Sequence, residues 1–324
     1  MAFTRAETLT ILNTFSTWIF QLSHLRPASQ VVLGPAEYID SLPSKNVRDL
    51  AADALNVWLD VPADHMAHIK DVVKTLHNAS LMQDDVEDGS ALRRGKPAAH
   101  MIFGTAQTIN AAGYQVVAAI GKAAKLNDER CVGIVNMYMG QAHDIYWSSG
   151  MAQPSAEEYL RMVDYKTGGL FRILASLMSA KSSDPKFPAP GLIMELSTLL
   201  GRYFQIRDDY MNLSSTDYTK QKGFCEDLDE GKFSLIMIHT MENAQEYDKM
   251  LLQGVLDQRH LAGSMSEPQK ELVLELMQKL GSLQYTRDVL QDMLGQISKE
   301  VAKIEEICGV KNKPLGMLLQ RLGV

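Results

Sequence analysis

The sequence has little cysteine, no long hydrophobic run and no excess of basic residues. Cys131, Cys225 and Cys308 lie far apart and outside any CxxC or Cys/His pattern, which argues against a disulfide framework and against a zinc site. No stretch approaches the roughly 20 apolar residues of a membrane span, and the N-terminal segment lacks a signal-peptide pattern. We therefore expect no membrane span and a reducing, cytoplasmic setting.

The charge balance argues against a second class of function. The chain carries 39 acidic and 32 basic side chains, a net charge of −7, whereas non-specific nucleic-acid binding needs a basic surface. We expect no nucleic-acid partner. A chain of 324 residues can bury a substantial core, so size is no obstacle to an enzyme.

Helical periodicity dominates what the sequence does contain. Apolar residues recur three and four positions apart, and strict alternation of apolar and polar residues is scarce, which predicts an all-α fold. The predicted helices span 47–59, 66–82, 105–124, 129–147, 156–180, 191–213, 233–252 and 267–307. Predicted breaks are Gly34-Pro35, Pro43-Ser44, 89–97, 181–191 and 214–232. We expect an N-terminal helix or linker over 1–32 and one functional domain over 33–324.

The first chemical signal is an acidic cluster, QDDVEDG, at the end of an otherwise apolar helix. At about 100° per residue, Asp84 and Asp88 fall within about 20° of His77 on one stripe, while Asp85 and Glu87 point elsewhere. A solvated helix end is the ordinary interpretation of such a cluster. Acidic side chains are unfavourable at a helix C-terminus, however, so cationic groups should compensate them here.

A second acidic pair lies in FQIRDDYMN (204–212), again within an apolar helix. Asp208 and Asn212 are one turn apart, and Gln205 shares roughly their face. Carboxylates on two facing helices are the hard oxygen ligands that Mg²⁺ uses when it bridges a protein to phosphates. We therefore predict Mg²⁺ as the cofactor.

Basic side chains lie near both acidic clusters. Arginine binds phosphate through a planar fork and lysine as a point charge. Each alone would be explained more simply as a solvated surface residue, but together they predict a diphosphate clamp. The set is Lys45, Arg48, Arg93, Arg94, Lys96, Lys166, Lys222 and Lys232. The polar stretch 214–232 is long for a compact domain, and we interpret it as a lid that carries two of these lysines.

These motifs resemble those of the trans-prenyl diphosphate synthases. DDVED followed by RR, then KTGG (166–169) and FQIRDD, match in order and spacing, and the resemblance runs from about Leu33 to the end of the sequence. LHNASLMQDDVED and KGFCEDLDEGKFS resemble fungal geranylgeranyl diphosphate synthases and, more closely, the prenyltransferase domain of fungal chimeric terpene synthases. The resemblance implies a single-domain isoprenoid synthase helical bundle with a central active-site cavity.

The resemblance also implies roles for individual residues. Isopentenyl diphosphate would bind to Lys45, Arg48, His77 and Arg94. Mg²⁺ on the allylic diphosphate (dimethylallyl, geranyl or farnesyl) would be held by Asp84, Asp88 and Asp208. Other contacts to that diphosphate would come from Arg93, Lys166, Thr167, Gln205, Asn212, Lys222 and Lys232. Of these, the predicted catalytic residues are Lys166, Gln205 and Lys232. The second motif often ends in aspartate, so Asn212 predicts a weaker metal site. As a lone residue, His77 would be read as a core histidine.

Small side chains near the first acidic cluster predict a long product. Residues one turn before Asp84 should meet the growing hydrocarbon tail first, and these are Ala79 and Ser80, where short-product members of the family carry aromatics. Val116 on the next long helix is also small. We expect an all-trans polyprenyl diphosphate of C20 (geranylgeranyl) or longer as a terpene precursor, with C20, C25 and C30 all open.

Two other functions compete with this interpretation. A class I terpene cyclase also uses an aspartate-rich helix, but 207–217 does not supply its second motif cleanly. A non-catalytic helical partner subunit would be expected to lose the acidic motifs, and both are present. The family commonly forms dimers and its fungal members hexamers, so we expect a homo-oligomer. If the chain is a piece of a longer protein, residues 1–32 would link it to a fused terpene cyclase domain.

Overall fold

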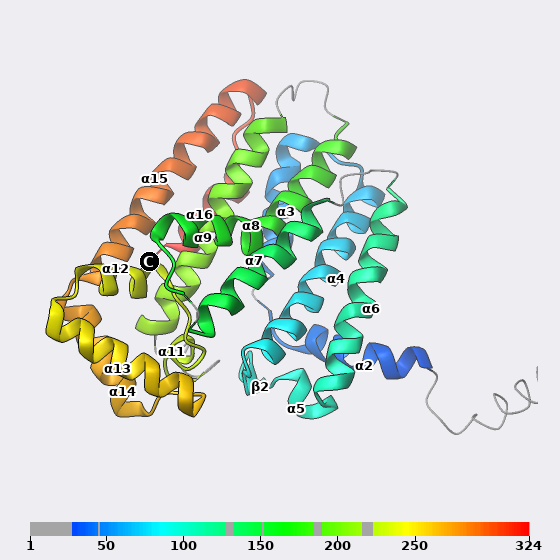
Figure 1. The fold of residues 1–324 in the computed structure, drawn as a ribbon. Helices are drawn as coiled ribbons and strands as arrows, with labels where there is room; N and C mark the ends of the chain where they lie inside the picture. The colour runs from blue at the N-terminus through cyan, green and yellow to red at the C-terminus, as the bar shows by residue number, and fades with distance from the viewer. Residues whose placement is uncertain are drawn as a thin grey trace, which may run out of the picture.

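The computed structural model is a bundle of helices and describes residues 28–44, 46–126, 132–150, 152–183, 190–215 and 223–323 (Figure 1). In chain order the helices are α2 (Ala28–Ser41), α3 (Val47–Leu59), α4 (Ala63–Glu87), α5 (Ala99–Phe103), α6 (Thr105–Ala124), α7 (Val132–Ser148), α8 (Ala156–Lys181), α9 (Pro190–Ser214), α11 (Glu226–Asp229), α12 (Leu235–Asn243), α13 (Glu246–Ala262), α14 (Glu267–Lys279), α15 (Ser282–Cys308) and α16 (Lys313–Leu322). Within these ranges there are two strands of two residues each, β1 (Leu92–Arg93) and β2 (Lys96–Pro97), which pair with each other in antiparallel orientation. The predicted all-α fold is confirmed.

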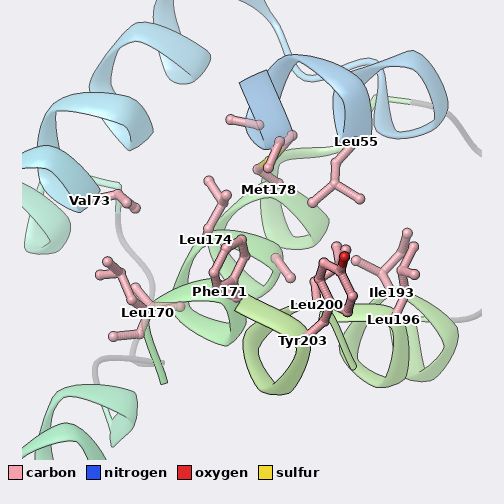
Figure 2. Close-up of a cluster of buried hydrophobic side chains, with 14 of the residues drawn as sticks. Leu55, Val73, Leu170, Phe171, Leu174, Met178, Ile193, Leu196, Leu200 and Tyr203 are labelled. Carbon is pink, nitrogen blue, oxygen red and sulfur yellow. The ribbon is translucent and has the colours of Figure 1, made fainter. Parts of the chain in front are cut away.

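The core lies where α8 and α9 pack together, with α3 and α4 against them. Figure 2 shows the apolar face of α8, where Leu170, Leu174 and Met178 recur every four residues and lie on one side of the helix. The facing side chains of α9 are Ile193, Leu196, Leu200 and Tyr203. Each fully buried aliphatic side chain of this kind stabilises the fold by about 1.5–3 kcal/mol. The core therefore holds rigid the two helices that carry KTGG and FQIRDD.

The predicted break at Gly34-Pro35 is wrong, because α2 continues through Pro35. Proline in a helix cannot donate to the carbonyl oxygen four residues earlier, which here belongs to Val31. Gln107 of α6 supplies the missing donor, since its Nε2 lies 2.5 Å from Val31 O. A contact from another helix thus offsets the hydrogen bond that proline removes.

Two long predicted helices are each divided in the structure. The segment 233–252 contains α12 and the start of α13, separated at Ala244–Gln245, and 267–307 contains α14 and α15. Gly281 separates the latter pair, with a φ of 70° that a residue without Cβ adopts freely. Apolar periodicity continues across both breaks, so the pattern alone did not reveal them.

The segments at the ends of the predicted domain are described in part. Helix α2 begins at Ala28, so it runs across the expected boundary at residue 33, and residues 1–27 lie outside the described part of the chain. Residues 216–222 of the predicted lid also lie outside the described part of the chain. Among the described helices, none combines the length and apolarity needed to cross a lipid bilayer.

Candidate active site

Two adjoining cavities open between the helices of the core. The first has a volume of about 330 Å³ and the second about 250 Å³. Six residues line both cavities: Arg48, Leu81, Arg93, Thr167, Phe204 and Asp208. Ligands bound in the two cavities would therefore lie side by side.

Asp84 lies in the wall of the first cavity, near the end of α4. Lys166 of α8 donates to its Oδ1 at 3.0 Å, and Arg93 Nη2 is 3.6 Å from Oδ2. Burial raises the pKa of Asp84, but the charges of Lys166, Lys232 and Arg93 outweigh it and hold that pKa well below its usual range. Asp84 is therefore a carboxylate, as a ligand for a cation must be.

Asp88 ends α4 and lies against a lysine from a distant segment. Lys232 Nζ is 3.3 Å from Asp88 Oδ2, an atom that accepts no hydrogen bond among the described residues. Burial, together with the neighbouring carboxylates of Asp84 and Glu230, raises the pKa of Asp88 to about 7, although the charge of Lys232 opposes this rise. Lys232 also pairs with Glu230, whose Oε1 accepts from Ser90 Oγ at 3.1 Å. Asp88 is thus a half-buried acid whose Oδ2 is ion-paired with Lys232, and it lines neither cavity.

Asp85 and Glu87 have separate partners. Asp85 is fully buried, and Arg93 Nε donates to its Oδ1 at 2.7 Å. Arg93 lines both cavities, so its predicted contact with a diphosphate would come from a guanidinium already fastened by a carboxylate. Glu87 is exposed and accepts from Gln141 at 2.7 Å, and it also lines the first cavity.

Lys166 lies between two carboxylates, only one of which the sequence analysis identified. Its Nζ is 2.6 Å from Asp144 Oδ2 and 3.0 Å from Asp84 Oδ1. Burial lowers the pKa of Lys166, but Asp144 and Asp84 outweigh it and raise that pKa above its usual value. The signal that could have found Asp144 is its spacing from Gln141, since two polar residues three apart share one face of α7.

A chain of hydrogen bonds runs from the cavity wall into the protein. Thr167 Oγ1 donates to Gln205 Oε1, and Gln205 Nε2 donates to Asp209 Oδ1 at 2.8 Å. Tyr159 Oη donates to Asp209 Oδ2 at 2.7 Å. Thr167 and Gln205 line the first cavity as predicted, whereas Asp209 and Tyr159 are buried behind them and were missed.

Close packing of α8 on α9 makes this chain of hydrogen bonds possible. A Cβ placed on Gly201 would lie 2.6 Å from Gly168 Cα, so neither backbone could approach the other as it does if Gly201 carried a side chain. Gly140 of α7 is packed in the same way against the backbone of Lys166. The close approach of Gly168 to Gly201 therefore brings Thr167, the residue before Gly168, within hydrogen-bond distance of Gln205.

Asp208 lines both cavities, but Asn212 lines neither. The helical spacing placed Asn212 on the face of Asp208, and its side chain is instead buried against α11, where Oδ1 accepts from Asp227 N at 3.3 Å. Its Nδ2 has no hydrogen-bond partner among the described residues. The expected contact of Asn212 with substrate therefore has no support in this geometry.

The second cavity is strongly basic. The charged residues in its described lining are Arg48, Arg93, Arg94, Arg207 and Asp208. Arg94 has a φ of 55° in the tight turn between β1 and β2, and its side chain lines this cavity. Arg207 belongs to the FQIRDD motif and was not predicted as a site residue. An anion is the ligand that this lining fits.

His77 lines the first cavity and contacts Arg48, which lines both cavities. Arg48 Nη1 is 2.6 Å from His77 Nε2, and because arginine can only donate, Nε2 is the acceptor. Burial lowers the pKa of His77 well below its usual value, and the charges of Arg48 and Arg94 lower it further. The neutral ring therefore orients Arg48. Lys45 and Lys222 lie outside the described residues, and Lys96 is exposed and lines neither cavity.

The end of the first cavity away from the acids is apolar. Ser80 and Val116 line it, as expected for the chain-length pocket, whereas Ala79 is fully buried and does not, because each residue turns the helix by about 100°. The remaining apolar wall, which includes residues not foreseen, consists of Leu76, Ile134, Met137 and Leu170.

A model of the polyprenyl synthetase family matches residues 29–277. The chain belongs to the polyprenyl synthetase family. This confirms the predicted family and the predicted class of enzyme, a transferase that builds prenyl diphosphates.

Relatives of this polyprenyl synthetase chain include much longer fungal proteins. It is 49% identical over 303 residues to phomopsene synthase of Phomopsis amygdali, covering 92% of this chain and 41% of that protein. The bifunctional sesterterpene synthase astC of Talaromyces wortmannii is 48% identical over 301 residues, covering 91% and 39%. Ophiobolin F synthase oblA of Emericella variicolor is 46% identical over 304 residues, covering 91% and 42%. The chain thus spans about two fifths of these relatives' length.

Within the described residues, no three His, Cys, Asp or Glu side chains cluster closely enough to hold a metal ion by themselves. The donors available are the carboxylates of Asp84 on α4 and Asp208 on α9, and Asp88 Oδ2, which is ion-paired with Lys232 but accepts no hydrogen bond among the described residues. These residues fit Mg²⁺, which binds through one or two carboxylates and completes its octahedron with water and substrate phosphates.

Proposed function

We propose that this chain catalyses Mg²⁺-dependent trans-prenyl transfer, in which isopentenyl diphosphate condenses with an allylic diphosphate. The carrying observation is the pair of adjoining cavities, one with aspartates beside buried lysines and one lined by four arginines. Two anionic substrates, only one of them bridged by a cation, match this division of charge. The allylic substrate is dimethylallyl, geranyl or farnesyl diphosphate.

Asp84 and Asp208 of the first cavity, together with Asp88, which pairs with the cavity residue Lys232, would hold Mg²⁺, and Mg²⁺ would neutralise charge on the allylic diphosphate. Lys166 and Lys232 lie beside these carboxylates and donate to the diphosphate oxygens as the carbon–oxygen bond breaks. Gln205 is oriented by Asp209 and by the hydroxyl of Thr167, and its second amide N–H contributes a neutral donor. Donors fixed in advance where charge develops are the largest single source of catalysis in such sites.

In the second cavity, Arg48 and Arg94 hold the diphosphate of isopentenyl diphosphate, while Arg93, which lines both cavities, contacts the allylic diphosphate. The residues shared by the two cavities place its double bond beside the allylic carbon. The π electrons form the new carbon–carbon bond, and loss of a proton from the adjacent carbon restores a double bond. Water must be excluded from the site during this step, because it would quench the allylic cation.

The apolar end of the first cavity would receive the growing chain and so determine product length. We propose an all-trans product of C20 or C25, because small Ser80 leaves space there and because several relatives are named for diterpene or sesterterpene synthesis. Ser80→Phe should shorten the main product by at least one C5 unit, as measured by mass spectrometry. Ser80→Ala is the matched control, since Ser80 Oγ bonds only the carbonyl of His77, and it should keep the length. An unchanged length in Ser80→Phe would contradict this pocket.

The reaction itself is tested by incubation with isopentenyl diphosphate, each allylic primer and either Mg²⁺ or EDTA, followed by product sizing. A polyprenyl diphosphate that forms only with Mg²⁺ and both substrates is the expected result. A hydrocarbon released from a polyprenyl diphosphate alone would indicate a terpene cyclase. Absence of product from every primer would indicate a non-catalytic partner subunit.

We also propose that the chain acts in the cytoplasm, as the prenyltransferase part of a longer protein with a terpene cyclase domain, and as a homo-oligomer. The chain covers only part of its bifunctional relatives, which supports the fusion with a terpene cyclase domain.

Exposed apolar side chains on three consecutive helices, α5 to α7, support a second copy of the chain as partner: Met101, Ile102, Ile109, Val117, Tyr138, Met139 and Tyr146. Light scattering of the purified chain should give a mass at least twice that of one chain.

A further inference from the structure

The last turn of α16 forms part of the wall of the second cavity. Leu322 lines this cavity and is only 6% exposed. Its carbonyl oxygen accepts two hydrogen bonds from α9, from Tyr203 Oη at 2.6 Å and from Arg207 Nε at 2.7 Å. Tyr203 and Arg207 are four residues apart, so they stack on one face of α9 and converge on this one oxygen.

The segment that leads into α16 is fastened to α3. Asn312 Nδ2 donates to Ala54 O at 2.8 Å, and Trp58 Nε1 donates to Val310 O at 3.1 Å. Helix α3 starts beside Arg48, and α9 carries Asp208. Helix α16 and the segment before it therefore contact both α3 and α9, and each of these helices contributes residues to the lining of the second cavity.

The carbonyl of Leu322 needs partners from outside its own helix. The last four carbonyl groups of an α-helix have no intrahelical donor, and a buried carbonyl without a donor costs free energy. Tyr203 and Arg207 supply both hydrogen bonds. Removing the Arg207 donor would free the last turn to shift relative to the cavity.

We infer that Arg207 is a positioning residue for isopentenyl diphosphate: through Leu322 O it keeps the last turn of α16 in place as a wall of the second cavity. This rests on the proposed function, because it assigns that cavity to isopentenyl diphosphate. The alternative is that Arg207 acts through its positive charge on the bound diphosphate. The two roles use different parts of the side chain, so substitutions can separate them.

Atom positions along the side chain make the separation possible. The Nε2 of glutamine is as many bonds from Cα as the Nε of arginine, so Arg207→Gln keeps a donor for Leu322 O but removes the charge. Lysine carries a methylene at that position and its ammonium one atom further, so Arg207→Lys keeps the charge but displaces the donor. Arg202→Lys is the matched control, since Arg202 lies on the same helix, pairs with Asp164 and lines neither cavity.

The experiment measures KM for isopentenyl diphosphate and for the allylic primer in wild-type and variant chains. Arg207→Lys should raise KM for isopentenyl diphosphate about tenfold, the effect of one lost hydrogen bond to a charged donor, and change the allylic KM less than twofold. Arg207→Gln should raise the first KM less than threefold, and Arg202→Lys should change neither. Amide hydrogen exchange at residues 319–322 should quicken in Arg207→Lys and not in Arg207→Gln.

The reverse order, with glutamine worse than lysine, would overturn the positioning role in favour of a direct charge contact. Equal changes in both KM values, or no change in Arg207→Lys, would also overturn it. A wild-type chain that makes no product refutes the proposed function instead. In that case hydrogen exchange still decides whether Arg207 holds the last turn of α16.

Discussion

The two Asp-Asp pairs of this protein have the same sequence and divide their tasks in the same way. Asp84 and Asp208 line the first cavity, whereas Asp85 and Asp209 are buried behind it. A helix turns about 100° per residue, so the two acids of a pair point in different directions, and here only the first of each reaches the cavity. The first acid of each pair is placed to meet a ligand, and the second orients another site residue.

The buried members differ in what they orient. Asp85 pairs with the guanidinium of Arg93, while Asp209 accepts hydrogen bonds from two neutral groups, Tyr159 Oη and Gln205 Nε2. Burial raises the pKa of Asp209 to about 6, and the two hydrogen bonds oppose this only in part. An acid buried with a cation thus stabilises a charge, whereas one buried with neutral donors fixes a direction.

The largest effect on stability should come from Asp85. Asp85→Ala leaves the Arg93 guanidinium buried without its main carboxylate, which should lower the free energy of unfolding by about 3–5 kcal/mol. Urea unfolding measures this. Asp53→Ala breaks the exposed pair with Lys70 and should cost less than about 1 kcal/mol. Equal losses in the two variants would refute the structural role of Asp85.

The cavity-facing acids should affect turnover instead. Asp84→Ala and Asp208→Ala should each lower kcat at least about 100-fold, or about 2.7 kcal/mol of activation free energy, because each removes one preorganised electrostatic element. A radiolabelled isopentenyl diphosphate assay measures the rate, and circular dichroism checks that the variants fold. Near-normal rates in both variants would contradict the assignment of these acids to the site.

Tyr159→Phe tests the neutral network around Asp209. Removing the hydroxyl leaves a buried carboxylate short of one donor and should lower the free energy of unfolding by about 1–3 kcal/mol. Thermal or urea unfolding would show the loss. Tyr247→Phe, at an exposed tyrosine, should change stability by less than about 0.5 kcal/mol, and a similar loss there would remove the contrast.

The smallest effect concerns His77, on the same stripe of α4 as Asp84. Because the folded ring stays neutral, the unfolded chain binds an extra proton below about pH 6.5, so unfolding free energy falls as pH falls, by at most about 1.4 kcal/mol per pH unit. His77→Gln cannot titrate and keeps an acceptor for Arg48, so it should lose less stability than wild type between pH 7 and 5. Urea unfolding at both pH values is the measurement. Exposed His143→Gln should behave like wild type, and an identical pH dependence in His77→Gln would contradict the burial of a neutral ring.

Much of the candidate site could be predicted from local periodicity and motif order. Asp84, Asp208, Lys166 and Gln205 all line the first cavity, because helical spacing shows which residues share a face. Asp144 and Arg207 were missed because their partners, Lys166 and the carbonyl of Leu322, are distant in the sequence. Asn212 is the opposite case. Its spacing correctly put it one helical turn from Asp208, but its side chain contacts α11 and lines neither cavity.

By itself, the sequence determined the all-α fold, the division of the first Asp-Asp pair and the family, since all three depend on residues close together in the chain. Only the tertiary structure decided which base meets which acid, as in Lys232 with Asp88 and Lys166 with Asp144. It also decided that Leu322 lines the second cavity and that its carbonyl accepts a hydrogen bond from Arg207. Such contacts depend on how closely helices cross, which here requires Gly168 and Gly201 to meet across a gap that no side chain could occupy.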